Sequence, residues 1–304
     1  MDKVQLGQSH LYVSPLALGC MSLGTNEQQA ERIIKEATDL GINYLDTADL
    51  YDKGINEEIV GKAIQPIRDD IVLATKVGNH LRPDGSWFWD ASKAYIKEQV
   101  KESLRRLHTD YIDLYQLHGG TIDDPIDDTI EAFEELVQEG YIRYYGISSI
   151  RPNVIREYVN RSNIISIMSQ YSLFDRRPEE EVLSLLDKQN ISVVTRGSLA
   201  KGLLSDHYQD VLNRKGQDGY LTYNHNDLKQ TIERLTDILD EGQTLAGLAF
   251  QYVLHANAVT SIVNGASSIQ QLKENVAAFE QSFDQDQIER AREITQPNYY
   301  QNHR

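Results

Sequence analysis

Short runs of apolar and β-branched residues alternate along the whole chain with longer stretches of mixed polarity. These runs are the candidate strands PLALG (15–19), INYLD (42–46), IVLATK (71–76), IDLYQLH (112–118), IRYYGI (142–147), ISIMSQ (165–170), ISVVTR (191–196) and TSIVNG (260–265). Strands so rich in apolar residues are typical of a parallel sheet that is covered on both faces.

The stretches between these runs carry apolar residues at three- and four-residue spacing, as amphipathic helices do. They include QQAERIIKEATDLG (28–41), IKEQVKESLRRLH (96–108), TIEAFEELVQEG (129–140) and EEEVLSLLDKQN (179–190). Two of them end in a glycine suited to a helix C-cap. Eight strand–helix alternations predict an α/β fold, a closed (β/α)8 TIM barrel. No linker interrupts the pattern, so we expect one domain over residues 1–304.

Two segments add to this plan. VQLGQSHLYVS (4–14) predicts a small N-terminal β-hairpin at the bottom of the barrel, and the polar segment 201–226 predicts a long loop after the seventh strand. Loops of that length are usually functional. The competing architecture is an open doubly wound sheet. It needs a glycine-rich dinucleotide fingerprint after the first strand, and LGCMSLGT (18–25) lacks the required spacing.

Composition narrows the class of protein. The chain has 304 residues, of which 40% are hydrophobic and 25% charged, as in a globular protein with a sizeable core. Its formal net charge of -16 argues against nucleic acid or an anionic membrane surface as partner. A single cysteine, Cys20, excludes an internal disulfide and fits a reducing compartment. No apolar signal segment or membrane span stands out, so we expect a soluble, cytoplasmic protein.

Four groups with acid–base character fall at or near the carboxyl ends of predicted strands, where barrel enzymes carry their active sites. Asp46, Lys76 and His118 end the second, third and fourth strands, and Tyr51 follows Asp46 by five positions. Taken singly, each is more simply explained as a solvated or structural residue. Together they form a set suited to proton transfer.

The chemistry explains why these residue types belong together. A free tyrosine has a pKa of about 10, and a nearby ammonium such as that of Lys76 lowers it. Asp46 can hold the ammonium by an ion pair, and His118 can hydrogen-bond a substrate carbonyl. Tyr51 can then donate a proton to the carbonyl oxygen as hydride reaches the carbon.

The chain closely resembles the aldo-keto reductase superfamily, in particular a bacterial branch that has LGCM near the start. The resemblance covers essentially the whole chain. It rests on INYLDTADLYDKGINEEIVGKAI (42–64), IVLATKVG (71–78), SLRRLHTDYIDLYQLHG (103–119), GYIRYYGISSI (140–150), MSQYS (168–172), SLAKGLL (198–204) and VNGASSIQQLKEN (263–275). It implies that Asp46, Tyr51, Lys76 and His118 are the catalytic tetrad of an oxidoreductase that reduces small carbonyl compounds.

The resemblance also implies that NADPH or NADP⁺ binds across the barrel mouth, with NADH as the alternative cofactor. The positions expected to contact it are Gly19, Cys20, Met21, Asp46, Ser148, Ser149, Gln170, Arg196, Gly197, Ser198, Leu199, Lys201, Gly202, Gly265, Ser267, Gln271, Glu274 and Asn275. Among them, Gln170 would bind the nicotinamide carboxamide beside Ser148, and Glu274 and Asn275 would grip the adenine. No metal is implied.

Two departures from the family pattern lie near the expected nicotinamide position. The usual Ser-Asn pair is Ser148-Ser149, in which the second side chain offers fewer hydrogen-bonding groups. Arg196 replaces an aromatic residue that often stacks on the nicotinamide. Its planar guanidinium would either stack there or point outward in an ion pair.

A third departure lies at the expected adenosine end. Basic residues that hold the 2′-phosphate of NADP elsewhere in the family are absent around Ser267 and Gln271. The serines and the helix start would have to serve instead. Lys273 is better explained as a solvated helix residue. Lys201 would either pair with the pyrophosphate or lie on the surface.

The segment NHLRPDGSWFWDAS (79–92) directly follows the third strand and holds both tryptophans of the chain. Clustered aromatic residues at the rim of a barrel suit an apolar aldehyde or ketone. We therefore expect a substrate pocket lined by Trp87, Trp89, Tyr51 and His118.

Two other functions fit parts of the sequence. A Schiff-base aldolase or lyase would use Lys76 alone and leaves Tyr51 and the later motifs unexplained. A regulatory subunit would bind the cofactor with little turnover, and an intact tetrad does not exclude it. The sequence leaves the physiological substrate, the reaction direction and the oligomeric state open.

Overall fold

The computed structural model describes residues 1–304 and has a closed barrel of parallel strands at its centre. The eight predicted strands are confirmed, and the closure excludes the open doubly wound sheet. In chain order the barrel strands are β3 (Leu16–Gly19), β4 (Tyr44–Asp46), β5 (Val72–Val77), β8 (Ile112–Leu117), β9 (Ile142–Ser148), β10 (Ser166–Gln170), β11 (Ser192–Arg196) and β12 (Val259–Gly265). Each pairs with the next, and β12 pairs with β3 to close the ring.

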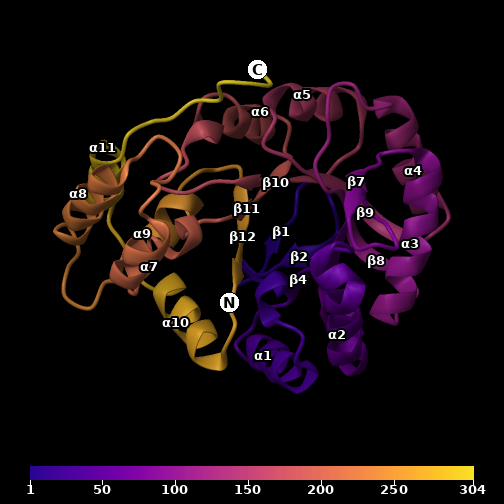
Figure 1. The fold of residues 1–304 in the computed structure, drawn as a ribbon, viewed down its shortest axis with the longest axis horizontal. Coiled ribbons are helices and arrows are strands. Elements are labelled where there is room, and N and C mark those ends of the chain that lie inside the picture. The colour runs from indigo at the N-terminus through magenta and orange to yellow at the C-terminus, as the bar shows by residue number, and fades with distance from the viewer.

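Helices surround the strands (Figure 1). They are α1 (Glu27–Asp39), α2 (Ile55–Ile64), α3 (Lys93–Leu107), α4 (Ile126–Gln138), α5 (Pro152–Arg161), α6 (Val182–Lys188), α7 (Tyr208–Lys215), α8 (His225–Thr236), α9 (Leu245–Leu254), α10 (Ile269–Phe279) and α11 (Gln285–Ile294). The predicted amphipathic stretches correspond to α1, α3, α4 and α6. Gly41 and Gly140 follow α1 and α4 with φ angles of 88° and 81°, as expected of glycines that end helices.

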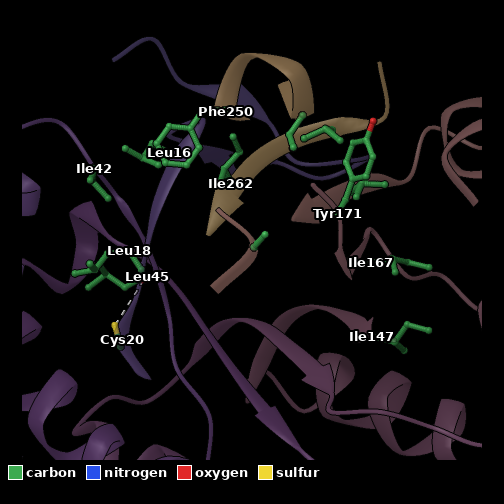
Figure 2. Packing of buried hydrophobic residues seen from close by; sticks show 14 of the residues in the cluster. Leu16, Leu18, Cys20, Ile42, Leu45, Ile147, Ile167, Tyr171, Phe250 and Ile262 are labelled. Carbon is green, nitrogen blue, oxygen red and sulfur yellow. Dashed lines mark hydrogen bonds between the residues drawn. The ribbon is translucent and has the colours of Figure 1, made fainter. Parts of the chain in front are cut away.

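The main hydrophobic core fills the layer between the strands and the helices. In this layer Figure 2 shows Leu18 of β3 and Leu45 of β4, which are partners in the strand pairing, close to Cys20. A second cluster fills the inside of the barrel and includes Tyr44 and Ala74. Fully burying one large aliphatic or aromatic side chain stabilises a fold by about 1.5–3 kcal/mol. The two clusters explain why the strands are apolar on both faces.

The predicted N-terminal hairpin is confirmed. It consists of β1 (Val4–Gln5) and β2 (Tyr12–Val13), paired antiparallel. Leu6 lies in the turn between these two strands and is wholly buried in the cluster inside the barrel. The N–H of Gly7 donates to Oγ of Ser192, the first residue of β11, at 2.7 Å. Because the beginnings of the strands mark the bottom of a barrel, the hairpin closes that end and leaves the other end open for a site.

Two segments contain regular structure that the sequence pattern did not predict. The segment 201–226, expected to be a loop, contains α7, which packs Val211 and Leu212 into buried positions. The aromatic segment 79–92 is an antiparallel hairpin of β6 (Asn79–Leu81) and β7 (Trp87–Trp89). Its turn contains Gly85 at a φ of 82°, in the left-handed region that glycine favours.

None of the helices combines the length and the apolar character needed to cross a membrane. No group of three or more His, Cys, Asp or Glu side chains is arranged to hold a metal ion.

Candidate active site

Strand periodicity brings the predicted acid–base residues to the mouth of the barrel. Side chains alternate between the two faces of a strand, so residues two apart point the same way. The cluster inside the barrel includes Tyr44 of β4, Ala74 of β5 and Leu114 of β8. Two positions further along these strands are Asp46, Lys76 and Gln116. These polar side chains therefore face inward near the carboxyl ends of their strands.

The same alternation acts on the other side of the barrel. Met168 of β10 and Val194 of β11 belong to the cluster inside the barrel. Gln170 and Arg196 follow them by two positions and end their strands. Two residues expected to contact the cofactor thus face the mouth from the side opposite β4 and β5.

Lys76 lies at the centre of the acid–base group and is completely buried. Its Nζ lies 2.6 Å from Oδ2 of Asp46, 2.7 Å from the carbonyl oxygen of Thr47 and 3.3 Å from the hydroxyl oxygen of Tyr51. The expected ion pair between Lys76 and Asp46 is present. Burial lowers the pKa of Lys76, but Asp46 and Tyr51 outweigh it and raise the pKa above its ordinary value. Lys76 therefore remains an ammonium at neutral pH.

Gln116 holds the second carboxylate oxygen of Asp46. Its Nε2 donates to Oδ1 of Asp46 at 3.3 Å, and the side chain of Gln116 is wholly buried. Gln116 was not among the site residues predicted from the sequence. Its position two residues before His118, on a strand with alternating inward residues, was the signal that could have found it.

The chain around Tyr51 is held from two directions. Oγ1 of Thr47 donates to Oδ1 of Asn56 in α2 at 2.7 Å, which fixes the segment before Tyr51. After Tyr51, both Asp52 and Lys53 have left-handed backbones, with φ angles of 48° and 58°. Non-glycine residues in this region cost about 1–3 kcal/mol each, and such strain is concentrated at functional sites.

The Tyr51 hydroxyl keeps its proton at neutral pH. Lys76 lowers the pKa of Tyr51, as expected from the sequence, but burial acts more strongly in the opposite direction. The net pKa lies above the ordinary value, so the expectation of a net decrease is wrong for the protein without ligands. The physical reason is that the phenolate loses more hydration in this site than one ammonium restores.

His118 directly follows β8 and lies beside Tyr51. Its main-chain N–H donates to the carbonyl of Val77 at 2.7 Å, and its ring centroid lies 6.0 Å from that of Tyr51 with the planes at 84°. Burial, together with the positive charges of Lys76 and Arg196, lowers the pKa of His118 to about 3. His118 is therefore neutral at physiological pH. A neutral imidazole donates a hydrogen bond from one ring nitrogen but is a poor source of a proton.

The charge of Arg196 also acts on the acid–base residues at the mouth. Its Nη1 donates to Oε1 of Gln170 at 2.8 Å, so the alternative of an outward ion pair is wrong. Although its side chain is exposed, its charge lowers the pKa of both Tyr51 and His118. The guanidinium consequently lies close enough to the mouth to act on the acid–base group.

Ser148 ends β9 at the same rim, and Ser149 directly follows it. The preceding residue, Ile147, belongs to the core outside the barrel, so Ser148 faces inward. Oγ of Ser149 accepts a hydrogen bond from the N–H of Arg151 at 3.2 Å. Ser148 thus retains a hydroxyl for a ligand, whereas that of Ser149 is already used locally.

The residues expected at the nicotinamide end from β3 differ in exposure. Gly19 and Gly265 are partners in the pairing of β3 with β12, so both lie at the mouth. Met21 is 64% exposed in the following turn. Cys20, in contrast, is wholly buried in the main core, with its thiol directed at the carbonyl of Leu18 (Figure 2). Its side chain therefore has no access to a ligand at the mouth, contrary to the expectation of direct contact.

The segment after β11 carries five further predicted contacts, Gly197, Ser198, Leu199, Lys201 and Gly202. Ser198 is buried, and its Oγ is hydrogen-bonded to Oγ1 of Thr195 at 3.1 Å. Nζ of Lys201 lies 6.0 Å from the ring centroid of Tyr220. Lys201 is exposed, and its ammonium lies beside the segment that precedes α8.

At the start of α10 the polar side chains form hydrogen bonds with one another and with the helix backbone. Oε1 of Gln271 accepts from both the N–H and the hydroxyl of Ser267, at 2.9 and 3.1 Å. Oγ of Ser268 accepts from the N–H of Gln271 as the helix N-cap. Lys273 is paired with Glu36 at 3.0 Å, in agreement with its interpretation as a surface residue. No arginine or lysine side chain forms a hydrogen bond with Ser267, Ser268 or Gln271.

The pair Glu274 and Asn275 lies further along α10. Nδ2 of Asn275 donates to the carbonyl of Gly265 at 3.2 Å, which ties the helix to the end of β12. Oε1 of Glu274 accepts from Nε2 of Gln270 at 2.8 Å. The side chain of Glu274 is partly exposed. Its other carboxylate oxygen, Oε2, lies 3.6 Å from Nε2 of His207.

Comparison with known proteins identifies the class to which this site belongs. The family model described as "Aldo/keto reductase family" matches residues 15–296. The chain belongs to the aldo-keto reductase family. It is 56% identical to the "Uncharacterized oxidoreductase YqkF" of Bacillus subtilis, over the full length of both proteins. It is 31% identical to the "NADH-specific methylglyoxal reductase" of Escherichia coli, with 91% of this chain and 93% of that protein covered.

The fold agrees with a solved aldo-keto reductase. The holo form of AKR11C1 from Bacillus halodurans is 56% identical, and it superposes with a TM-score of 0.92 over 100% of this chain and 99% of that one. As a member of the family, this aldo-keto reductase is a nicotinamide-dependent oxidoreductase that acts on small molecules. The predicted fold class and enzyme class are both confirmed.

Membership of the family also decides against the Schiff-base alternative. A lysine that forms a Schiff base needs a neutral amine, usually with a lowered pKa. In this aldo-keto reductase Asp46 and Tyr51 raise the pKa of Lys76 instead.

The aromatic hairpin contacts the rim through one of its two tryptophans. A Cβ atom on Gly119, which follows His118, would lie 3.1 Å from the ring of Trp89, so this ring packs beside the end of β8. Nε1 of Trp89 donates to Oδ1 of Asp124 at 2.9 Å, which fixes the ring. Trp87, in contrast, is 53% exposed.

Proposed function

We propose that this aldo-keto reductase reduces aldehydes and ketones to alcohols with NADPH, in the reducing environment of the cytoplasm. In this proposal Tyr51 gives a proton to the substrate oxygen. Lys76 and Asp46 support Tyr51, and His118 orients the carbonyl by donating a hydrogen bond. The bound nicotinamide supplies the hydride.

One observation carries the assignment of roles. Only Tyr51 combines a protonated hydroxyl with direct contact to a buried ammonium, at 3.3 Å from Nζ of Lys76. His118, with a pKa near 3, holds no transferable proton at neutral pH. Reduction builds negative charge on the carbonyl oxygen, and a phenol beside an ammonium both stabilises that charge and neutralises it. This chemistry supports Tyr51 as the general acid.

The residues at the mouth fit a nicotinamide cofactor. Gln170 directs its carbonyl oxygen toward the mouth, where Arg196 already donates to it. The carboxamide of a nicotinamide offers an N–H₂ group that matches this acceptor. Ser148 offers a hydroxyl from the neighbouring strand β9, and the paired residues Gly19 and Gly265 lie at the same rim. These groups would hold the ring end of the cofactor across the barrel.

The preference for NADPH over NADH depends on the start of α10. We assign the 2′-phosphate to Ser267, Ser268 and the N-terminal N–H groups of the helix, because helix starts attract phosphate. This requires Gln271 to release Ser267, and no cationic side chain assists. The selectivity for NADPH is therefore expected to be small.

A substitution at Gln271 tests this assignment. Gln271→Arg should tighten NADPH binding by about 5- to 10-fold, because an arginine forms charge-assisted hydrogen bonds with phosphate. NADH binding should change by less than about twofold, since NADH has no 2′-phosphate and the gain comes from phosphate contacts alone. Both dissociation constants are measured by titration of nucleotide fluorescence. Lys273→Gln is the matched control, since Lys273 pairs with Glu36, and it should change neither constant. If Gln271→Arg tightened the binding of both nucleotides equally, the assignment of the 2′-phosphate to the start of α10 would be wrong.

The substrate pocket is proposed to lie over Tyr51 and His118, with Trp89 as its aromatic wall and Trp87 at its outer edge. Trp89 packs beside Gly119, so an apolar substituent on the carbonyl could lie against it. This arrangement favours aldehydes and ketones with an aromatic or aliphatic group over strongly charged substrates.

The function is tested by titrating the protein with NADPH and with NADH, and then adding an aromatic aldehyde and a dicarbonyl compound. Binding of a nucleotide followed by carbonyl-dependent loss of nicotinamide absorbance is the expected result. Binding without turnover of either carbonyl would favour a regulatory role. Absence of binding of both nucleotides would contradict the proposal at its cofactor site.

A further inference from the structure

The side-chain amide of Gln170 is hydrogen-bonded through its N–H₂ group to two residues that have no part in the proposed reaction. Nε2 of Gln170 donates to Oδ2 of Asp175 at 2.8 Å and to the hydroxyl of Tyr220 at 3.2 Å. Asp175 lies in the turn after β10, and Tyr220 lies in the segment between α7 and α8. On the other side, Oε1 of Gln170 accepts from Arg196. All the polar atoms of the amide therefore have assigned partners.

Asp175 determines which end of this amide faces the mouth. Its side chain is wholly buried, and its two oxygens accept from Nε and Nη2 of Arg177, each at 2.7 Å. A carboxylate paired in this way can only accept hydrogen bonds. Gln170 must then present its N–H₂ group to Asp175 and its carbonyl oxygen to the mouth. The opposite orientation would bring two acceptor oxygens together in a buried position, at a cost in unsatisfied groups.

We propose that Asp175 is a positioning residue for the cofactor, and that it makes the site select a nicotinamide whose ring substituent donates a hydrogen bond. The inference rests on the proposed function, in which Gln170 contacts the carboxamide. Asp175 does not touch the cofactor. It acts through Gln170, whose outward carbonyl oxygen can accept from a carboxamide N–H₂ but offers nothing to a ligand that only accepts.

Cofactor analogues separate this role from a general contribution to folding. The 3-acetylpyridine analogue of NADP⁺ keeps the carbonyl of the carboxamide but replaces the N–H₂ group by a methyl group. It therefore lacks the donor that Gln170 requires. The unmodified protein should bind NADP⁺ about 3- to 10-fold more tightly than this analogue, the range expected for one hydrogen bond.

The decisive variant is Asp175→Asn. Asparagine has both a donor and an acceptor, so position 175 no longer dictates which end of Gln170 faces the mouth, and only the exposed Arg196 still favours the carbonyl oxygen there. The ratio of the two dissociation constants, measured by isothermal titration, should fall from about 3–10 to about 1–2 as the preference worth one hydrogen bond is lost. Because the ratio compares two ligands on one protein sample, a loss of folded protein lowers both signals and leaves the ratio unchanged. Asp175→Ser, whose hydroxyl can also donate, replaces this variant if the asparagine protein is insoluble.

Tyr220→Phe is the matched control. It removes the second acceptor of the Gln170 N–H₂ group but leaves Asp175 in place, so the ratio should stay within about twofold of its original value, since the net worth of one hydrogen bond is small. An unchanged ratio in the Asp175 variants would overturn the inference while leaving the proposed function intact. A failure of the unmodified protein to bind NADP⁺ would instead overturn the proposed function. A ratio near 1 in the unmodified protein, with NADP⁺ bound, would also overturn the inference.

Discussion

Tyr51→Phe is expected to lower kcat for carbonyl reduction by about 100-fold or more, the range measured for loss of a general acid. The variant removes only the hydroxyl that lies 3.3 Å from Nζ of Lys76 and keeps the ring that contacts His118. The dissociation constant for the nucleotide should stay within about twofold, since uniform binding is not affected by a group that acts in the transition state. Both quantities follow from steady-state kinetics and fluorescence titration.

Tyr44→Phe provides a matched control for this variant. Tyr44 is buried inside the barrel two positions before Asp46, and its hydroxyl has no hydrogen-bond partner. Its removal costs no hydrogen bond, so kcat should stay close to that of the original protein. Turnover of Tyr51→Phe within about threefold of the original would contradict the assignment of the general acid, which calls for at least a 100-fold loss.

The pH profile gives a second readout of the same group. Because the pKa of Tyr51 is raised by burial, its hydroxyl is protonated throughout the neutral range. Reduction needs this proton, so its rate should be level near neutrality and fall only in the alkaline range. Oxidation of an alcohol needs the phenolate and should rise with pH over the same alkaline range. Both limbs should disappear from the residual activity of Tyr51→Phe.

The barrel fold and the clustering of polar side chains at its mouth were predictable, because both follow from short-range patterns in the sequence. Apolar runs separated by amphipathic stretches define eight strand–helix units, and alternation within a strand places Asp46 and Lys76 above the interior cluster. The same alternation places Gln116 on the inward face, although Gln116 was not among the predicted site residues. Tyr51 lies outside any strand and follows no periodic rule, so its selection rested on its position shortly after Asp46, on its acid–base chemistry and on the family resemblance.

The properties that were not predicted depend on contacts and charges contributed by residues far apart in the sequence. The net pKa of Tyr51 is a balance between burial by several elements and the charges of Lys76, Asp46 and Arg196, and the sequence does not reveal how deeply the hydroxyl is buried. The contacts that orient Gln170 join residues up to 50 positions apart. Cys20 follows a strand end at the rim, yet its side chain falls on the outward, core-facing side. The segment with α7 is polar throughout except for a few buried positions, so its periodicity is weak.

Lys76→Met should abolish the support of Tyr51 and also destabilise the protein. The variant leaves Asp46 buried without its cation, and breaking a buried ion pair from one side costs about 3–5 kcal/mol in the free energy of unfolding. Adding Asp46→Asn removes the uncompensated charge, and asparagine can still accept from Gln116. The double variant should therefore recover most of the lost stability but none of the activity. Denaturant unfolding of the two single variants and the double variant measures this coupling.

The stability of Lys76→Met should depend on pH in a direction set by Asp46. Burial pushes the pKa of Asp46 upward, and Lys76 is the main group that opposes this. Without Lys76 the pKa in the folded protein lies above the value of about 3.9 in the unfolded chain. The folded state then binds more protons than the unfolded state between these two values, so the free energy of unfolding falls as pH rises through that window. The variant should consequently be more stable near pH 5 than near pH 7, relative to the original protein. The same loss at both pH values would mean that Asp46 is not the group left uncompensated, and that the cost of removing Lys76 comes from packing alone.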